Sequence, residues 1–295
     1  MVNIIDLHFL QVPEAIAAYV VPTENGAVLI ECGPHSTINQ LVAGLDRLGL
    51  QPKDVHTLLL THIHFDHAGA AWWLAEHGTH VYVHPRGHKH MLAPERLYES
   101  ARMIYQDKMD ELWGKMEPIN SEKCSAVDDG EVLHLDGLTF TAHHTPGHAV
   151  HHIAWQLGDD LFTGDVAGVK IGDGPVVPPC PPPDVHVEDW RNSIDAMRKL
   201  SPARLYLTHY GLVDNANDHL DELSDYLTVY AEWMKPHFLA GTDPDKITPK
   251  FVEFVEADFR AKGLDAAAIA SYNAANPPWM SVVGLLRYWR KHGEV

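Results

Sequence analysis

Four residues of metal-binding types stand within six positions of one another in the first quarter of the chain. Residues 58–69 read LLLTHIHFDHAG, which includes His62, His64, Asp66 and His67. Neutral imidazoles and a carboxylate are ligands that suit zinc and similar transition metals. Side chains alternate along an extended segment, so His62 and His64 share one side, and a turn through Phe65 brings Asp66 and His67 to a second point a few ångströms away. The pattern predicts a metal site, and its division into two pairs favours two metal ions.

The elements that must position this motif alternate between strands and helices. An apolar run predicts a buried strand over Val55–Leu60 that leads directly into the motif. Earlier apolar runs predict strands at residues 4–12, 17–22 and 26–32, followed by a one-faced apolar helix at about residues 36–49. A helix over Gly69–Glu76 and a strand at residues 81–83 come next. This alternation predicts an α/β layered domain.

Residues 86–118 break the alternation. Apolar residues recur there at three- and four-residue spacing with no strand nearby, namely Leu97, Ala101, Tyr105, Met109, Leu112 and Met116. The spacing predicts a helical insertion. One interpretation is a lid or a wall of the substrate pocket, which would bring Tyr105 to the substrate. The other is a set of helices that only packs on the core.

The second half of the chain begins with further strands at residues 132–135, 138–142, 153–157 and 161–162. A proline-rich stretch over residues 172–183 favours an extended loop, which follows Asp165 closely enough to line a substrate cleft. A helix from Glu188 to about Leu200 and a strand at residues 205–207 complete a domain that we expect to cover residues 1–213.

From residue 214 onward the pattern is helical. The first predicted helix carries a stripe of apolar residues from Leu220 and ends at Pro236. Thr248-Pro249 is typical of a cap with a first-turn proline, and Lys262-Gly263 is the matching stop. A final helix is expected over Trp279–His292. We expect residues 214–295 to form a helical region packed on the core.

The composition narrows the function and the compartment. The chain has 295 residues and a formal net charge of −18, which argues against a nucleic-acid-binding protein because phosphate binding needs a basic face. The sparse, odd set of Cys32, Cys124 and Cys180 does not resemble a disulfide framework and favours a reducing compartment. No signal peptide and no membrane-spanning run is evident. We expect a soluble cytoplasmic protein with a small-molecule substrate and no membrane partner, and the sequence leaves a homodimer open.

The motif of His62, His64, Asp66 and His67 resembles the metal motif of the metallo-β-lactamase-fold hydrolase superfamily. The other parts of that pattern follow in order along the chain: Thr145-Pro146-Gly147-His148, Gly164-Asp165 and Thr208-His209. The resemblance covers roughly residues 1–212, points to the glyoxalase II-like branch and implies a four-layer αββα sandwich. It implies that one metal binds His62, His64 and His148, that the other binds Asp66, His67 and His209, and that Asp165 bridges the two.

The resemblance also implies a reaction. Two Zn²⁺ ions, with Mn²⁺ or Fe²⁺ as alternatives, lie roughly 3.5–4 Å apart in such sites and share a hydroxide that attacks a carbonyl or phosphorus centre. Asp66 would orient this nucleophile, and Tyr210 is a candidate for hydrogen-bonding the oxyanion. His84, Tyr105 and Cys180 are candidates for the substrate pocket. The expected function is hydrolysis of an ester, thioester or lactone of a small metabolite.

Histidines flank the third ligand on both sides. His143, His144, His151 and His152 surround His148 in sequence, and some of them are expected to fix the orientation of ligands. Strand alternation would turn about half of them away from the site.

Other members of the superfamily remain as alternatives. Persulfide dioxygenases carry a similar motif, but they bind one iron through the equivalents of His62, His148 and Asp165 and carry out redox chemistry. β-Lactamase activity fits less well, since the B1 β-lactamases carry a cysteine where this chain has Asp165. Phosphodiesterase or nuclease activity also fits less well, because the acidic charge disfavours binding of nucleic acid. Acyl-homoserine lactonases carry a tyrosine where this chain has Gly168, which argues against lactone hydrolysis of that type. Glyoxalase II enzymes usually carry Gly-His-Glu at the last ligand, where this chain has Thr208-His209-Tyr210. A protein that keeps the fold for binding alone is disfavoured by the intact ligand set.

Overall fold

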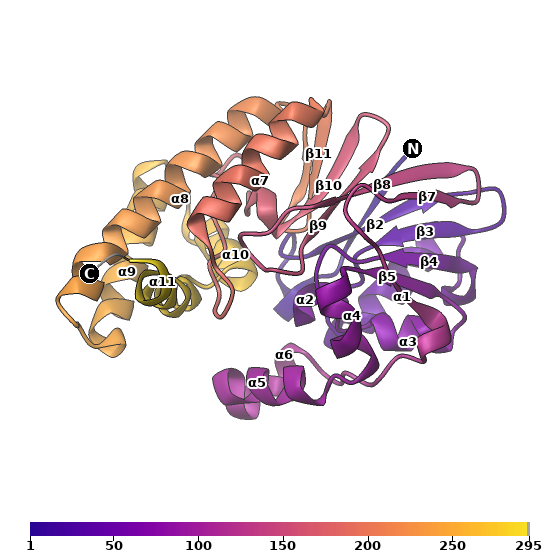
Figure 1. Cartoon of the computed structure of the whole chain (residues 1–295), viewed down its shortest axis with the longest axis horizontal. Helices are drawn as coiled ribbons and strands as arrows, with labels where there is room; N and C mark the ends of the chain where they lie inside the picture. The colour runs from indigo at the N-terminus through magenta and orange to yellow at the C-terminus, as the bar shows by residue number, and fades with distance from the viewer. Residues whose placement is uncertain (294–295) are drawn as a thin grey trace. The chain divides into compact units, whose positions relative to one another are not determined.

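Two six-stranded sheets run through residues 1–293, the part of the chain that the computed structural model describes (Figure 1). In the first sheet the strands lie in the order β1-β2-β3-β4-β5-β6, with β1 to β3 antiparallel and β3 to β6 parallel. Its strands are β1 (Asn3–Asp6), β2 (Ala17–Pro22), β3 (Ala27–Ile30), β4 (Val55–Leu59), β5 (His80–Val83) and β6 (Cys124–Ala126).

The second sheet has the order β12-β11-β10-β9-β8-β7. Neighbouring strands pair antiparallel from β7 to β10 and again in β11 and β12. Its strands are β7 (Val132–Leu135), β8 (Leu138–His144), β9 (Ile153–Leu157), β10 (Asp160–Gly164), β11 (Arg204–Leu207) and β12 (Gly211–Val213).

The described residues also form eleven α-helices. They are α1 (Ile38–Arg47), α2 (Phe65–Ala68), α3 (Ala71–Glu76), α4 (Pro85–Leu92), α5 (Glu95–Tyr105), α6 (Met109–Leu112), α7 (Val187–Leu200), α8 (Ala216–Leu239), α9 (Pro244–Ala261), α10 (Ala266–Ala275) and α11 (Pro278–His292). The predicted α/β sandwich with a helical insertion and a helical C-terminal region is confirmed.

Internal contacts divide the chain into two units. Unit 1 consists of residues 1–144 and 151–162, and unit 2 consists of residues 145–150 and all residues from 163 onward. The proposed metal motif at residues 62–67 belongs to unit 1, whereas His148, Asp165 and His209 belong to unit 2.

The core of unit 1 lies between its strands from the two sheets. Leu58 and Leu59 in β4 are completely buried. This burial explains the continuous apolar run in the sequence, which is typical of a parallel strand covered on both faces. Tyr19 in β2 meets Phe162 in β10 edge to face at 5.5 Å, and the indole of Trp155 donates a 2.9 Å hydrogen bond to the carbonyl of Leu60. Helices α1, α3 and α4 gather along the first sheet in Figure 1. These contacts fix the end of β4, from which the metal motif departs.

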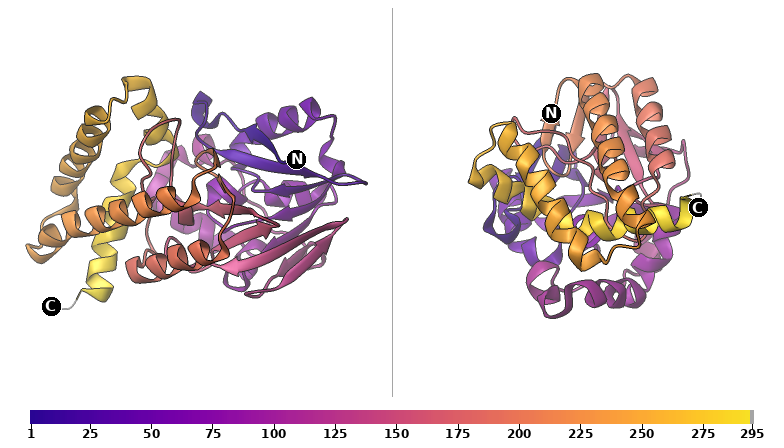
Figure 2. Two further views of the ribbon diagram at one scale, coloured as in Figure 1. Left: turned by 90° about the horizontal axis from the view of Figure 1, so that it is seen from above. Right: turned by 90° about the vertical axis from the view of Figure 1, so that its left-hand side faces the viewer.

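The C-terminal helices of unit 2 pack on one another through aromatic and aliphatic side chains. Phe251 and Phe259 on α9 are buried, as are Leu227 and Met234 on α8. Helix α11 contacts both α8 and α9 and crosses α8 in Figure 2, and the Trp289 indole on α11 donates to the Ala231 carbonyl on α8 at 2.8 Å. None of the helices in the described part of the chain combines the length and the apolar character needed to cross a membrane.

Three details of the predicted elements were wrong. The strand expected at residues 4–12 ends at Asp6, because Leu10 and Gln11 adopt left-handed conformations and the Asp6 carboxylate accepts hydrogen bonds from the backbone of His8 and Glu14. Helix α8 continues through Pro236, and no strong kink is needed because a proline this close to a helix end removes only one late hydrogen bond.

Helix α9 begins at Pro244 rather than at Thr248-Pro249. Asp243 caps it by accepting from the backbone of Asp245 at 2.9 Å, and the Thr248 hydroxyl bonds back to the Pro244 carbonyl inside the helix. The buried side chains of α9 offset the hydrogen bond lost at Pro249. Helix α10 was not predicted, because its alanine-rich segment has no amphipathic stripe.

Replacing Phe251 by alanine should lower the free energy of unfolding by about 3–5 kcal/mol, since the change leaves a cavity between α8 and α9. Phe254→Ala is the matched control, because Phe254 lies on the same helix and is only half-buried. Denaturant titrations followed by circular dichroism measure both losses. Equal losses for the two variants would show that burial on α9 does not determine the stability of this region.

Candidate metal centre

In unit 1, His62 and His64 lie just beyond β4 and converge on one point. The Nε2 atom of His62 lies 2.9 Å from the Nδ1 atom of His64, and the two rings meet edge to face at 4.5 Å. The chain is extended at His64, with φ −63° and ψ 154°, so both side chains leave the backbone on the same side. Two imidazole nitrogens that converge in this way can bind one metal ion together.

Asp66 and His67 form a second pair on the first turn of α2. An oxygen of Asp66 lies 3.7 Å from Nε2 of His67. The His67 ring is fully buried, whereas the Asp66 side chain is about one-fifth exposed (21%) and accessible to a reacting water. The turn through Phe65 therefore places two donor pairs in unit 1.

Glu31 contacts His67 directly and His62 through Thr61, and so reaches one histidine of each donor pair. This role was not predicted from the sequence. This carboxylate follows β3, is 1% exposed and accepts a 2.9 Å hydrogen bond from Nδ1 of His67. It also accepts from the Thr61 hydroxyl, whose oxygen lies 3.1 Å from Nδ1 of His62. With Nδ1 acting as the donor, each imidazole turns its Nε2 lone pair outward. One carboxylate thus sets the tautomer of two histidines.

In unit 2, the two oxygens of Asp165 face two different histidines. Oδ2 lies 3.2 Å from Nε2 of His148, and Oδ1 lies 3.4 Å from Nε2 of His209. All three side chains are buried. Asp165 starts a short 3₁₀ turn immediately after Gly164, which has φ 50° and permits the sharp exit from β10. The Asp165 carboxylate thus lies between two imidazole nitrogens of unit 2.

Backbone contacts hold the histidines of unit 2. Nδ1 of His148 donates a 2.8 Å hydrogen bond to the carbonyl of Pro179. The backbone of His209 is paired with Lys170, whose N–H donates to the His209 carbonyl at 2.6 Å. Gly147 precedes His148 with φ 136°, and a Cβ there would come within 2.3 Å of Trp190. Only glycine fits this close approach of the ligand loop to α7.

The donor chemistry fits a divalent metal. Nδ1–H of His148 donates a hydrogen bond to the Pro179 carbonyl. In the neutral ring, Nε2 then directs its lone pair toward an oxygen of Asp165. His67 does the same toward Asp66, because its Nδ1 proton is directed to Glu31. A lone pair facing a buried anion is unfavourable unless a cation lies between them or the ring takes a second proton.

Among the flanking histidines, His151 and His152 lie beside the first pair and the other two do not. The His152 ring is fully buried and stacks on His62 at 5.1 Å, and the His151 ring lies 5.6 Å from that of His64. His143 turns away to Gln156, with 2.8 Å between the two side chains. Two of the four thus lie away from this pair, but the division does not follow strand alternation, because His143 and His144 are adjacent in β8 and His151 and His152 precede β9.

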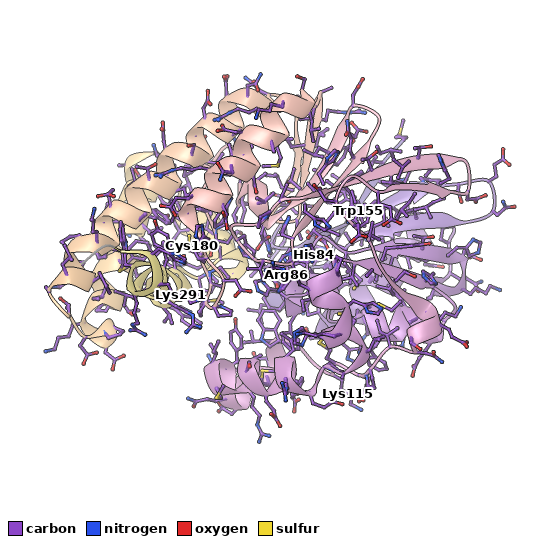
Figure 3. All side chains as sticks on the ribbon, in the orientation of Figure 1. His84, Arg86, Lys115, Trp155, Cys180 and Lys291 are labelled. Atoms are coloured by element: carbon purple, nitrogen blue, oxygen red, sulfur yellow. The ribbon has the colours of Figure 1, made fainter. Side chains whose placement is uncertain are left out.

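The candidate pocket residues lie in different environments. His84 is buried, accepts from the Arg86 backbone at 2.9 Å as the cap of α4, and lies against the His144 ring at 4.0 Å; Figure 3 labels His84 and Arg86 together. Tyr105 ends α5, and burial together with the negative charge of Asp66 raises its pKa, so the helical insertion comes near the second donor pair.

Cys180 and Tyr210 belong to unit 2. Cys180 is completely buried, and burial raises the pKa of its thiol well above the ordinary value, so it is an inert side chain rather than a nucleophile. Tyr210 is half-buried next to His209, and its N–H donates to the Lys170 carbonyl at 3.1 Å. The roles of these four residues toward a substrate remain predictions.

Comparison with known proteins identifies the family. The model of the metallo-β-lactamase superfamily matches residues 12–209, so the chain belongs to this superfamily, whose members are largely metal-dependent hydrolases. The fold implies binding of divalent metal, and the residues present fit that expectation.

Individual relatives agree with this assignment. The chain is 29% identical to the metallo-β-lactamase fold-containing protein ST1585 of Sulfurisphaera tokodaii over 72% of this chain and 80% of that protein. It is 32% identical to the hydroxyacylglutathione hydrolase GloC of Haemophilus influenzae, over 48% of this chain and 62% of the enzyme. The structure of the metallo-β-lactamase family protein TTHA1429 from Thermus thermophilus superposes with a TM-score of 0.71 over 99% of this chain and 94% of that one, at 20% identity, and so shares the fold.

Glu31→Gln should weaken metal binding by about 10- to 100-fold, because the amide cannot accept equally well from His67 and Thr61. Glu24→Gln removes the same charge from an exposed position and serves as the control. Competition with a chromophoric chelator measures the affinity for Zn²⁺. Unchanged affinity in Glu31→Gln, with a normal melting temperature, would show that Glu31 does not support the ligands.

His84 predicts a loss of stability in acid. Burial, together with the charges of His144 and Arg86, lowers its pKa from the ordinary 6.5 to about 4. Between these two pKa values His84 binds a proton in the unfolded chain but not in the folded chain. The free energy of unfolding therefore falls as the pH drops from about 6.5 toward 4. His84→Asn keeps a capping acceptor without titrating, so its loss between pH 7.5 and pH 5 should be smaller than that of the wild type. The exposed His134→Asn should behave like the wild type, and identical pH profiles for all three proteins would contradict the assignment.

Proposed function

We propose that this chain is a dinuclear metal hydrolase that cleaves an ester, thioester or lactone of a small metabolite. The observation that carries the proposal is the pairing of donors: two pairs in unit 1, and in unit 2 a carboxylate that turns one oxygen to each of two histidines. In this proposal His62, His64 and His148 hold one ion, and Asp66, His67 and His209 hold the other. Asp165 is shared.

Zinc is the favoured metal because imidazoles and carboxylates are among its common ligands, and Mn²⁺ or Fe²⁺ are the alternatives. When bound, such a pair of ions lowers the pKa of a water so that it is a nucleophile near neutral pH, and it draws negative charge toward the substrate oxygen. These contributions suit acyl transfer to water.

The side chains of the protein have separate tasks in that reaction. The Asp66 side chain stays partly exposed, so its carboxylate can orient the attacking water and carry a proton to the leaving group. Tyr210, fixed through its backbone to Lys170, can donate its phenolic proton to the developing oxyanion. Glu31 keeps His67 and, through Thr61, His62 in the tautomers that leave Nε2 free to bind metal.

The substrate class follows from the relatives and the charge. GloC is named for a hydroxyacylglutathione substrate, and the similarity supports a carbon–sulfur or carbon–oxygen acyl bond. The segment Thr208-His209-Tyr210 differs from the Gly-His-Glu of glyoxalase II, so we do not assign glutathione as the thiol. The net charge of −18 supports a small molecule rather than a nucleic acid as the substrate. The sparse, odd set of cysteines supports action in a reducing compartment, for which we propose the cytoplasm.

The proposal is tested by counting metals and removing ligands. Protein purified without added metal should contain about two zinc or manganese ions per chain by elemental mass spectrometry. His64→Ala and Asp165→Ala should each lower the metal content and reduce kcat on a panel of esters, thioesters and lactones by at least about 100-fold. His134→Ala, in an exposed histidine, should change neither quantity.

Other outcomes would overturn the proposal. One iron per chain with oxygen uptake on a persulfide would indicate the dioxygenase alternative. Full activity in either ligand variant would refute the ligand assignment.

A further inference from the structure

The loop of residues 169–183, which includes the proline-rich stretch, contacts both proposed histidine ligands of unit 2. At one end, the N–H of Lys170 donates to the His209 carbonyl at 2.6 Å. At the other end, the carbonyl of Pro179 accepts the Nδ1 proton of His148 at 2.8 Å. Val169 and Val177 also form a β-bridge through hydrogen bonds of 2.9 and 3.0 Å. The loop therefore connects two ligands that are distant in sequence.

Helix α10 holds the first half of this loop through a single buried hydroxyl. The Tyr272 oxygen accepts from the N–H of Ile171 at 3.0 Å and donates to the carbonyl of Pro175 at 2.7 Å. Tyr272 is 1% exposed. Gly174 lies so close that a Cβ would come within 2.4 Å of the Tyr272 oxygen. The hydroxyl thus replaces a backbone partner for the turn that follows Lys170.

Helix α11 holds the second half. The Ser281 hydroxyl accepts from the N–H of Cys180 at 3.3 Å. Gly284, one turn later on α11, lets the loop approach so closely that a Cβ would come within 2.0 Å of the Cys180 carbonyl. Figure 3 shows Cys180 beside this helix. The residue held in this way is the direct neighbour of Pro179, whose carbonyl orients His148.

We propose that Tyr272 and Ser281 are positioning residues for the metal centre, acting through the loop on His209 and His148. The C-terminal helices would then be a working part of the ligand scaffold rather than an added module. This inference rests on the proposed metal binding by these two histidines. Groups that orient metal ligands typically change metal affinity by 10- to 100-fold when they are removed.

A simpler role for these residues would be stability alone. Both hydroxyls satisfy buried backbone groups, and their loss lowers the free energy of unfolding whatever the loop does. A purely structural role would leave the metal affinity and the ligand geometry of the folded protein unchanged. Metal affinity measured well below the melting temperature separates the two roles.

The experiment compares Tyr272→Phe, Ser281→Ala and the control Tyr288→Phe in the full-length protein. Tyr288 is also buried in the C-terminal helices and its hydroxyl donates to Glu188 at 2.6 Å, but this contact does not involve the loop. Zn²⁺ affinity is measured by chelator competition, and the geometry at the site is measured by the visible absorption of the Co²⁺-substituted protein. Melting temperatures are recorded for all variants.

We expect Tyr272→Phe and the milder Ser281→Ala to weaken the binding of at least one Zn²⁺ by about 10-fold or more and to shift the Co²⁺ bands. Tyr288→Phe should lose stability and retain wild-type affinity and spectrum. Wild-type affinity and spectrum in both loop variants, with two ions bound per chain, would overturn this inference and leave the proposed function intact. A wild-type protein that binds no metal would overturn the proposed function, and the inference with it.

Discussion

The buried Asp165 carboxylate, with an imidazole nitrogen facing each of its oxygens, is the interaction on which the arrangement of unit 2 depends. A buried carboxylate is costly unless it is paired, and here one oxygen of Asp165 lies 3.2 Å from Nε2 of His148 and the other 3.4 Å from Nε2 of His209. The surrounding structure is organised so that this group cannot move away. The Trp190 indole on α7 donates to the Val166 carbonyl, and His219 on α8 donates to the Ala167 carbonyl, at 2.8 and 2.7 Å.

The two units use different acceptors to orient the ring of a proposed histidine ligand. In unit 1 a buried carboxylate, Glu31, accepts the ring proton of His67 and reaches His62 through a hydroxyl. In unit 2 a backbone carbonyl, that of Pro179, accepts the ring proton of His148. A carboxylate partner pulls the ring proton more strongly than a carbonyl does, so His67 is the more electron-rich ligand.

The proposed ligands could be predicted from the sequence because their signal is local. Four ligand types after an apolar strand, and glycines beside His148 and Asp165, can be recognised without knowing what packs against them. Glu31 was missed because its role depends on a contact across more than thirty residues, and an acidic residue after an apolar strand has no such meaning by itself. Tyr272 and Ser281 were missed for the same reason, about one hundred residues from the loop they hold. Pro236 and Pro249 misled the prediction because tertiary burial in α8 and α9 outweighs a local penalty of one hydrogen bond.

Charge balance links these contacts to the proposed metals. In the proposed centre, Asp66, Asp165 and Glu31 would bring three negative charges, and His67 and His148 each direct Nδ1 to a second partner. Two divalent ions would bring four positive charges, which leaves one positive charge over and therefore favours one anionic ligand from solution. That remaining charge is what a hydrolase needs at the point of attack, because it stabilises hydroxide over water and then the oxyanion that replaces it.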